Sequence, residues 1–449
     1  MPITETTKDT VKLPAIRWVM ILLCFLILGI SYIDRINLAI AAPHIKKELG
    51  FNDGEMGLIL GAFFWTYAFG QLPAGWFTDK IGAKIGLALS AAWWSVFTVV
   101  TGFANSVAAM FGSRMMLGIG EAGSNPACVK VVYGWFPKRE RGLASGLFDA
   151  GPQAGTALAL PLVAWLIHAF DWRMSFYVTG GLGLVWVALW LLIYREPEND
   201  RSITPQQLAA LREGVETDKA PAEHVPWSSL FKYRTMWGMM IGFFCMNFVK
   251  YFFITWFPTY LVSAKGFSLG QLGTLGAIPA LMSLPGSVLG GWMTDHLFHR
   301  GFSLTASRKI CLAGGMLTSS VIAFAAFTDS IALMLVLFSI TYAALAFTAA
   351  VIWCVPADVA PSKAHVASIG GIQNFASNLA GVGITSVTGL MLWLSGGSFL
   401  GPLLLAGGVC ILGALNYIFV VGTIEPFGGA PKAAPQADRA LPAASPTTA

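Results

Sequence analysis

The chain has 449 residues, of which 55% are hydrophobic and only 11% are charged, and its formal net charge is +5 at pH 7. Soluble proteins carry about 25% charged residues, so this composition excludes an ordinary soluble domain. The charged residues fall between apolar blocks, so the net positive charge reflects the composition of the loops. It gives no indication of nucleic-acid binding.

The apolar blocks predict an all-α integral membrane protein with about twelve transmembrane helices, because crossing the hydrocarbon core takes roughly 20 apolar residues. Short segments of alternating hydrophobicity, the pattern of a membrane β-barrel, do not occur. The predicted helices begin near Trp18, Met56, Ile85, Val107, Gly142, Met174, Met236, Gln271, Lys309, Ile331, Val366 and Leu400.

The first apolar block is too long for a signal-peptide core and lacks a following cleavage site, so we expect it to be retained. Asp34 and Arg35 lie near its middle. A lone charge there costs about 2.5–3.5 kcal/mol on insertion scales, so such residues persist mainly in bundle interiors or water-filled paths. The guanidinium of Arg35 matches a carboxylate, and we predict that it binds an anionic substrate. Asp34 is either a proton-coupling acid or a structural partner that keeps Arg35 insertable.

The fourth block carries another pair of charges. Arg114 and Glu121 are two turns apart on one face of the predicted helix. Glu121 is the second candidate for proton coupling. Arg114 either holds a carboxylate, and so joins the substrate site, or is a cation near the outer interface. Pro126 should loosen the helix just beyond Glu121.

A polar, proline-containing stretch divides the chain into two halves. The expected division is an N-terminal tail (1–16), a six-helix bundle (17–194), a linker with a short surface helix (195–235), a second six-helix bundle (236–421) and a disordered tail (422–449). With both termini in the cytoplasm, the inner side holds about twenty of the 28 lysines and arginines. This bias fits the positive-inside rule.

The two halves repeat each other. Residues 75–79 (GWFTD) end the second block, and residues 291–295 (GWMTD) end the eighth. At nearly the same offset Pro43 corresponds to Pro258, and Arg35 then corresponds to Lys250. Two cations therefore occupy equivalent positions, and internal repeats with a site at their interface are typical of secondary transporters.

The two loops with glycine and aspartate resemble the signature of the major facilitator superfamily. Several segments resemble its anion:cation symporter branch, which includes bacterial hexuronate, galactonate and glucarate transporters: 32–37 (YIDRIN), 114–122 (RMMLGIGEA), 135–142 (WFPKRERG), 171–173 (DWR) and 255–261 (TWFPTYL). The resemblance extends over all the predicted helices and is strongest in the N-terminal half. Gly123 and Ser124 depart from the more apolar residues of the branch, so the resemblance does not specify the sugar acid.

This resemblance implies further substrate-binding residues at Tyr32, Tyr67, Gln153, Trp353 and Asn374. Hydroxyl and amide groups suit a polyol, although hydrogen bonds between helices explain such residues equally well. Trp353 either stacks on the substrate or fills the core.

Lys250 has two interpretations. It is either a second anion contact, for instance for the second carboxylate of a diacid, or a lysine that snorkels to the outer face. Asp79, Arg141 and Asp295 belong to inner loops, and we predict that they form a cytoplasmic gate in which Arg141 pairs with Asp79. Asp149 is a candidate for a gate contact or for a proton-carrying role.

The predicted function is proton-coupled symport of a sugar acid by alternating access, in a monomer of the inner membrane. An organophosphate/phosphate exchanger of the same superfamily is the alternative, because paired cations also suit a phosphate dianion. The six cysteines have no paired spacing and the sequence has no His-Glu-x-x-His motif. We therefore expect no metal, no cofactor and no enzymatic activity.

Overall fold

The computed structural model describes residues 13–137, 140–212, 227–360 and 366–427, without the side chains of Leu72, Asp79, Asp149, Trp227 and Ala367. Every regular element in these ranges is helical. Ten helical segments are long and apolar enough to cross a membrane. Two further passes are made by the first part of α2 and by the α3–α4 pair, so the predicted all-α membrane fold is confirmed.

The first bundle contains α1 (Ile16–Leu49), α2 (Asp53–Phe103), α3 (Val107–Glu121), α4 (Ser124–Trp135), α5 (Arg141–Ala169) and α6 (Trp172–Ile193). Two predicted passes merge into α2, which is interrupted at Gly82, where φ is 85° and ψ is 163°. Glycine adopts positive φ at little cost, so the chain can turn here and return across the bundle.

The linker carries a short 3-10 turn, η1 (Pro197–Asn199), and two short helices, α7 (Pro205–Arg212) and α8 (Trp227–Leu230). The predicted short linker helix is therefore present as α7. The expected disordered tail lies almost wholly outside the described residues.

The second bundle has the same number of passes but more interruptions. Its seventh and eighth passes are broken at Pro258 and Pro279, which stand at the starts of short helices. Its elements are α9 (Arg234–Thr255), α10 (Phe257–Thr259), η3 (Tyr260–Ala264), α11 (Leu269–Thr274), η4 (Leu275–Ala277), α12 (Ile278–Leu281), α13 (Ser283–His299), α14 (Leu304–Ser319), η5 (Ser320–Phe327), α15 (Ile331–Ile352), α16 (Val355–Val359), α17 (Val366–Ser395), α18 (Leu400–Leu415) and η7 (Asn416–Val420).

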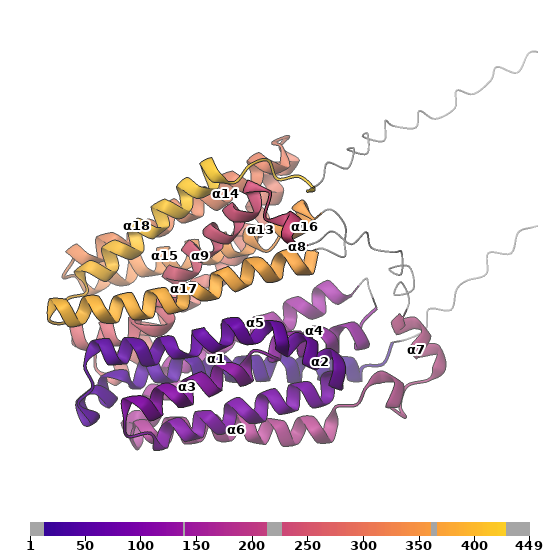
Figure 1. Ribbon diagram of the computed structural model, residues 1–449, viewed down its shortest axis with the longest axis horizontal. Helices are drawn as coiled ribbons and strands as arrows, with labels where there is room; N and C mark the ends of the chain where they lie inside the picture. Colours follow the sequence, from indigo (N-terminus) through magenta and orange to yellow (C-terminus); the bar gives the residue numbers. More distant parts are fainter. Residues whose placement is uncertain (1–12, 138–139, 213–226, 361–365, 428–449) are drawn as a thin grey trace, which may run out of the picture.

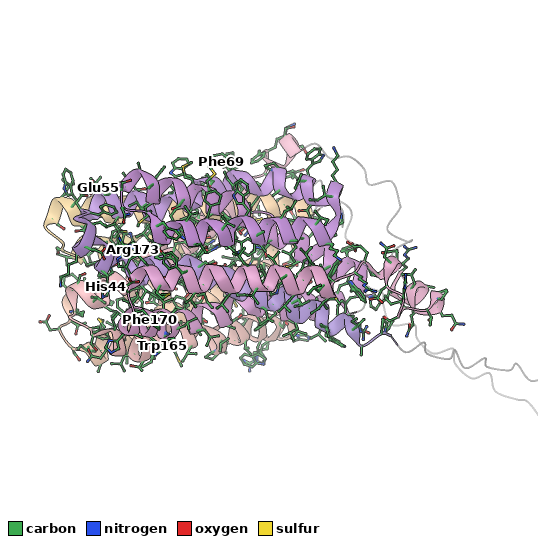
Figure 2. The ribbon with its side chains drawn as sticks, turned by 90° about the horizontal axis from the view of Figure 1, so that it is seen from below. His44, Glu55, Phe69, Trp165, Phe170 and Arg173 are labelled. Carbon is green, nitrogen blue, oxygen red and sulfur yellow. The ribbon has the colours of Figure 1, made fainter. Side chains whose placement is uncertain are left out.

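The two bundles lie side by side with their helices roughly parallel to the long axis of the molecule (Figure 1). We call the end that carries α7 the linker end, and the opposite end, where α1 joins α2, the far end. Figure 2 shows His44, Glu55 and Arg173 at the far end.

Large apolar side chains cover the outside of the molecule. Trp165 is 58% exposed and Phe69 is 54% exposed, and both appear among the labelled surface side chains of Figure 2. Soluble proteins rarely expose so much contiguous apolar surface, whereas a surface of this kind is suited to lipid.

Close contact between the two bundles is concentrated toward the far end. A Cβ on Gly57 of α2 would lie 2.8 Å from the carbonyl oxygen of Thr385 and 2.9 Å from the Cα of Gly389, both on α17. On the other side, a Cβ on Gly273 of α11 would lie 3.2 Å from the Cα of Pro161 on α5. The bundles therefore meet backbone to backbone here, which closes this end of the space between them.

Candidate functional site

A cavity of about 440 Å³ lies between the two bundles. All the predicted substrate-binding residues except Arg114 line it, namely Tyr32, Arg35, Tyr67, Gln153, Lys250, Trp353 and Asn374. Its size falls within the range of about 300–1,000 Å³ that is usual for small-molecule sites.

The cavity widens toward the linker end. Trp353, near the linker end of its pass, is 53% exposed, and Val129 on α4 is 48% exposed. Deeper in the cavity, Tyr251 and Tyr342 are each only 6% exposed. Together with the backbone contacts at the far end, this gradient places the opening at the linker end.

The guanidinium of Arg35 is held at the cavity wall by several contacts. Its Nε donates a hydrogen bond of 2.7 Å to Oε1 of Glu121, and its Nη2 lies 2.5 Å from the same oxygen. Its Cζ lies 4.6 Å from the ring centroids of Tyr32 and Phe63 and 4.5 Å from that of Tyr67. The ion pair and the cation–π contacts together hold one cation at a fixed place in an apolar surrounding.

Glu121 is the last residue of α3, and the helix is interrupted immediately after it. The next helix, α4, begins at Ser124, and Pro126 lies in its first turn, where a missing N–H costs little. The predicted loosening at Pro126 is therefore confirmed. Only one carboxylate oxygen of Glu121 is used: Oε2 is buried and has no hydrogen-bond partner among the described residues.

Asp34 is adjacent to Arg35 in the sequence but is fully buried and does not line the cavity. Neither of its carboxylate oxygens accepts a hydrogen bond from any described residue, although the side chains of Thr98 and Thr179 lie close to it. Consecutive helical residues point about 100° apart, so α1 directs Arg35 to the cavity and Asp34 into the first bundle.

Arg114 lies behind the cavity wall, only 2% exposed. Its Nη1 donates a hydrogen bond of 3.4 Å to the backbone carbonyl of Asp34, and its Cζ is 5.7 Å from the ring centroid of Phe63. No carboxylate within the described ranges forms an ion pair with it. Arg114 thus contacts the backbone of Asp34, and its burial does not fit a cation at the interface.

The second bundle supplies a polar wall to the cavity. Asn247 and Lys250 lie about one turn apart on α9, Tyr251 directly follows Lys250, and all three line the cavity. The hydroxyl of Tyr251 donates a 2.8 Å hydrogen bond to Oδ1 of Asn378, which donates a 3.0 Å bond to the backbone oxygen of Asn374.

Several neutral polar lining residues did not stand out in the sequence: Asn125, Asn247, Tyr251, Ser283, Ser287 and Tyr342. Their one-turn spacing, as between Ser283 and Ser287, was the available signal. A lone polar residue in a span, however, has another common use. Asn37, for example, accepts from Ser175 at 2.6 Å and donates to Thr179 at 3.2 Å, so it joins α1 to α6.

The predicted gate residues are only partly described. The side chains of Asp79 and Asp149 lie outside the described residues. Arg141 stacks on Tyr133 at 3.7 Å and donates to the backbone oxygens of Phe136 and Tyr133. Asp295 is exposed, while in the same repeat motif Thr294 accepts a 3.1 Å hydrogen bond from Arg308, which also binds Asp358 at 2.8 Å.

The arrangement is suited to binding and has no evident reactive centre. Arg35 and Lys250 provide two cations from opposite bundles, and the tyrosine, asparagine, glutamine and serine side chains of the wall can bind hydroxyl groups. The cavity therefore suits a hydroxylated organic anion.

Comparison with known proteins agrees with this geometry. The profile of the Major Facilitator Superfamily matches residues 24–383. The chain is 33% identical over 422 residues to a D-galactonate transporter of Escherichia coli O6:H1 (strain CFT073), which covers 92% of this chain and 97% of that protein. It is 34% identical over 429 residues to a probable galactarate/D-glucarate transporter of Bacillus subtilis (strain 168), covering 92% and 94% of the two chains.

A solved structure is similar over nearly the whole chain. It is a bacterial homolog of the human lysosomal transporter Spinster in an inward-facing and occupied conformation, with a TM-score of 0.72 and 18% identity over 91% of this chain and 96% of that chain. At this identity the similarity shows the fold alone.

Proposed function

The chain belongs to the Major Facilitator Superfamily, and from this membership we propose that it is a proton-coupled symporter of a sugar acid, such as a hexuronate, an aldonate or an aldarate. The names of its relatives, a galactonate and a probable galactarate/glucarate transporter, support the substrate class. The hydroxyl- and amide-lined cavity supports it independently, because such groups can bind the hydroxyls of a polyol.

The observation that carries the proposal is the ion pair between Arg35, which lines the cavity, and Glu121, which is buried behind it. The guanidinium that would bind the substrate carboxylate is held by a carboxylate of the protein. Substrate anion and Glu121 therefore compete for the same donor groups, and a proton on Glu121 decides the competition.

The transport cycle follows from this competition. Protonation of Glu121 removes its charge and releases the planar fork of Arg35 for the substrate. The loaded carrier then rocks one bundle against the other and exposes the cavity on the opposite side. Loss of the proton there restores the carboxylate of Glu121, which displaces the substrate from Arg35.

Asp34 is the second proton-coupling residue of the proposal. It is fully buried and its carboxylate oxygens accept no hydrogen bond from the described residues. A carboxylate in such a place is far less costly to bury as the neutral acid. Arg114 binds the backbone of Asp34, so we assign it to positioning Asp34 beside the Arg35–Glu121 pair, and the contact with substrate falls to Arg35.

The proposed setting is the inner membrane, with one copy of the chain and both termini in the cytoplasm. The distribution of lysine and arginine supports this orientation. The linker end then faces the cytoplasm, and the cavity, which widens toward this end, is in an inward-facing state. The units that rock are the predicted bundles 17–194 and 236–421.

Uptake into proteoliposomes tests the proposal. The purified full-length chain is reconstituted and offered a panel of radiolabelled hexuronates, aldonates and aldarates, with and without an inward proton gradient. We expect accumulation of at least one sugar acid above equilibrium only with the gradient. If none accumulates, proton-coupled symport of sugar acids is excluded.

An organophosphate/phosphate exchanger is the second candidate, because Arg35 and Lys250 lie in one cavity and two cations suit a phosphate dianion. Glu121 argues against it, since its carboxylate directly behind Arg35 repels a dianion when it is charged. Exchange of external against internal inorganic phosphate distinguishes the two candidates.

We also propose that the chain is a carrier without catalytic activity. Its one Gly-x-Ser-x-Gly pattern, at residues 266–270, does not form a nucleophile site. Ser268 is instead the N-cap of α11, and its hydroxyl accepts a hydrogen bond from the backbone N–H of Gln271. Recovery of chemically unchanged substrate from the vesicle lumen checks this point.

A further inference from the structure

The cavity contains a second cation in addition to Arg35. Lys250 lies on α9, the first helix of the second bundle, as Arg35 lies on α1, the first helix of the first bundle. Both line the cavity. The internal repeat has therefore placed one cation in each wall of the cavity.

The surface near Lys250 is suited to hydrogen bonding. Asn247 and Tyr251 lie one turn or one residue away on α9, and Ser283 and Ser287 lie one turn apart on α13. Further polar residues of the lining include Tyr67 on α2 and Asn374 on α17. Hydroxyl-binding groups are thus available alongside both cations.

We propose that the substrate is a dianionic sugar acid of the aldarate class, with one carboxylate on Arg35 and the other on Lys250. This inference rests on the proposed function and specifies its substrate. An aldarate carries a carboxylate at each end of its carbon chain and hydroxyls between them, and the cavity lining offers two cations and several neutral hydrogen-bonding groups for them. Both carboxylates are ionised at neutral pH, because such groups have pKa values of about 3–4 in water.

Galactarate and galactonate make a matched pair of probes. They share the same carbon skeleton and hydroxyl stereochemistry, and differ only at C6, which is a carboxylate in galactarate and a hydroxymethyl group in galactonate. A hydrogen bond to a charged group raises binding affinity more than a hydrogen bond to a poorly fitting neutral group does. The difference is a factor of about ten to a hundred. We expect the full-length carrier to bind galactarate about tenfold or more tightly than galactonate.

The variant Lys250→Gln tests the residue. We expect it to lose its affinity for galactarate by about tenfold or more while galactonate binding changes little. Lys250→Arg retains the charge and should keep the preference for the diacid. Lys265→Gln is the matched control, because it removes the same charge outside the cavity. Lys265 lies at the far end, where it donates a hydrogen bond to the backbone oxygen of Thr328.

The outcomes separate the inference from the function on which it rests. If wild-type protein binds both probes equally, or if Lys250→Gln weakens both to the same extent, the two-carboxylate assignment is wrong while sugar-acid transport stands. If neither probe binds or is taken up, the proposed function itself fails. If Lys250→Gln does not fold, the ratio of the wild-type affinities for galactarate and galactonate still tests the two-carboxylate assignment.

Discussion

Asn374 on α17 donates a hydrogen bond of 3.2 Å from its Nδ2 to Oε1 of Gln71 on α2, so a residue of the cavity wall is tied to the opposite bundle. Asn374 lines the cavity and Gln71 does not. A substrate hydroxyl that accepts a hydrogen bond from the same N–H of Asn374 has to compete with Gln71. Substrate binding would thus weaken one of the links that hold the two bundles together.

Removing the side chain of Gln71 and removing that of Asn374 should therefore change the affinity for substrate in opposite directions. Gln71→Leu frees the amide of Asn374 and should tighten substrate binding about threefold, since a hydrogen bond between membrane helices contributes roughly 0.6 kcal/mol. Asn374→Leu removes the substrate contact and should weaken binding. Competition binding to purified protein measures both constants.

A second amide provides the control for this pair. Asn416 donates a 2.8 Å hydrogen bond to the backbone oxygen of Gly238, within the second bundle and away from the cavity. Asn416→Leu should lower stability without changing affinity. If Gln71→Leu weakens binding as much as Asn374→Leu does, Gln71 supports the site and does not compete with the substrate.

Neutralising Glu121 should uncouple transport from the proton gradient. Glu121→Gln leaves Arg35 without a charged competitor at any pH, so substrate should bind without a preceding protonation. We expect gradient-driven accumulation to be lost and substrate exchange across the vesicle membrane to remain. Radiolabelled uptake and counterflow in the same vesicles measure the two activities.

Glu48→Gln is the matched control for this variant. Glu48 forms an ion pair with Arg173 at the far end, 2.5 Å between its Oε1 and Nη1 of the arginine, and lies outside the cavity. The Glu48→Gln variant should accumulate substrate to the same level as the wild type. Full accumulation by Glu121→Gln would show that the Arg35–Glu121 pair is structural.

Asp34→Asn should separate coupling from folding. The carboxylate is fully buried and accepts no hydrogen bond from the described residues, so removing its charge should raise the free energy of unfolding by on the order of 1 kcal/mol. Driven accumulation should nevertheless disappear while exchange is at least partly kept. Thermal unfolding in detergent and uptake in vesicles provide the two measurements, and full driven uptake would make Asp34 a structural residue.

A methyl group at the far-end contact should shift the carrier toward its other conformation. In Gly57→Ala the new Cβ would lie 2.8 Å from the backbone oxygen of Thr385, and overpacking of this kind costs about 1–3 kcal/mol. The cost applies only while the far end is closed, so the state open at the far end should gain population. Spin labels at Leu58 and Leu394, both exposed on α2 and α17, should report longer distances.

Gly314→Ala is the control for this prediction, because a Cβ at Gly314 meets no atom within 4 Å. Its distance distribution should match that of the wild type. An unchanged distribution in Gly57→Ala would mean that α2 and α17 adjust to the methyl group without separating.

The positions of the membrane passes could be predicted from sequence because the bilayer imposes both their length and their composition. Helices α3, α15 and α18 begin at the predicted residues Val107, Ile331 and Leu400. The α3–α4 interruption was indicated by Pro126, whose effect on a helix is local. The merging of two passes into α2 was not indicated, because it depends on the single conformation of Gly82.

The site could be predicted only as far as its residues were unusual for a membrane helix. Arg35 and Lys250 stood out because charge is costly there, and the family resemblance added Tyr67 and Asn374. Neutral residues such as Asn247 and Asn37 look alike in sequence, yet Asn247 lines the cavity and Asn37 binds α6. Which way such a side chain faces depends on the rotation of its helix against its neighbours.

By itself, the sequence determined that this chain crosses the membrane many times, that its halves repeat, and that Asp34, Arg35 and Glu121 are charged residues within apolar blocks. Hydrophobicity and the cost of buried charge act locally, so a linear pattern is enough to reveal them. Only the tertiary structure decided that Arg35 pairs with Glu121, 86 residues away, and not with adjacent Asp34. An ion pair requires its two groups to point at each other, and the packing of α1 against its neighbours sets those directions.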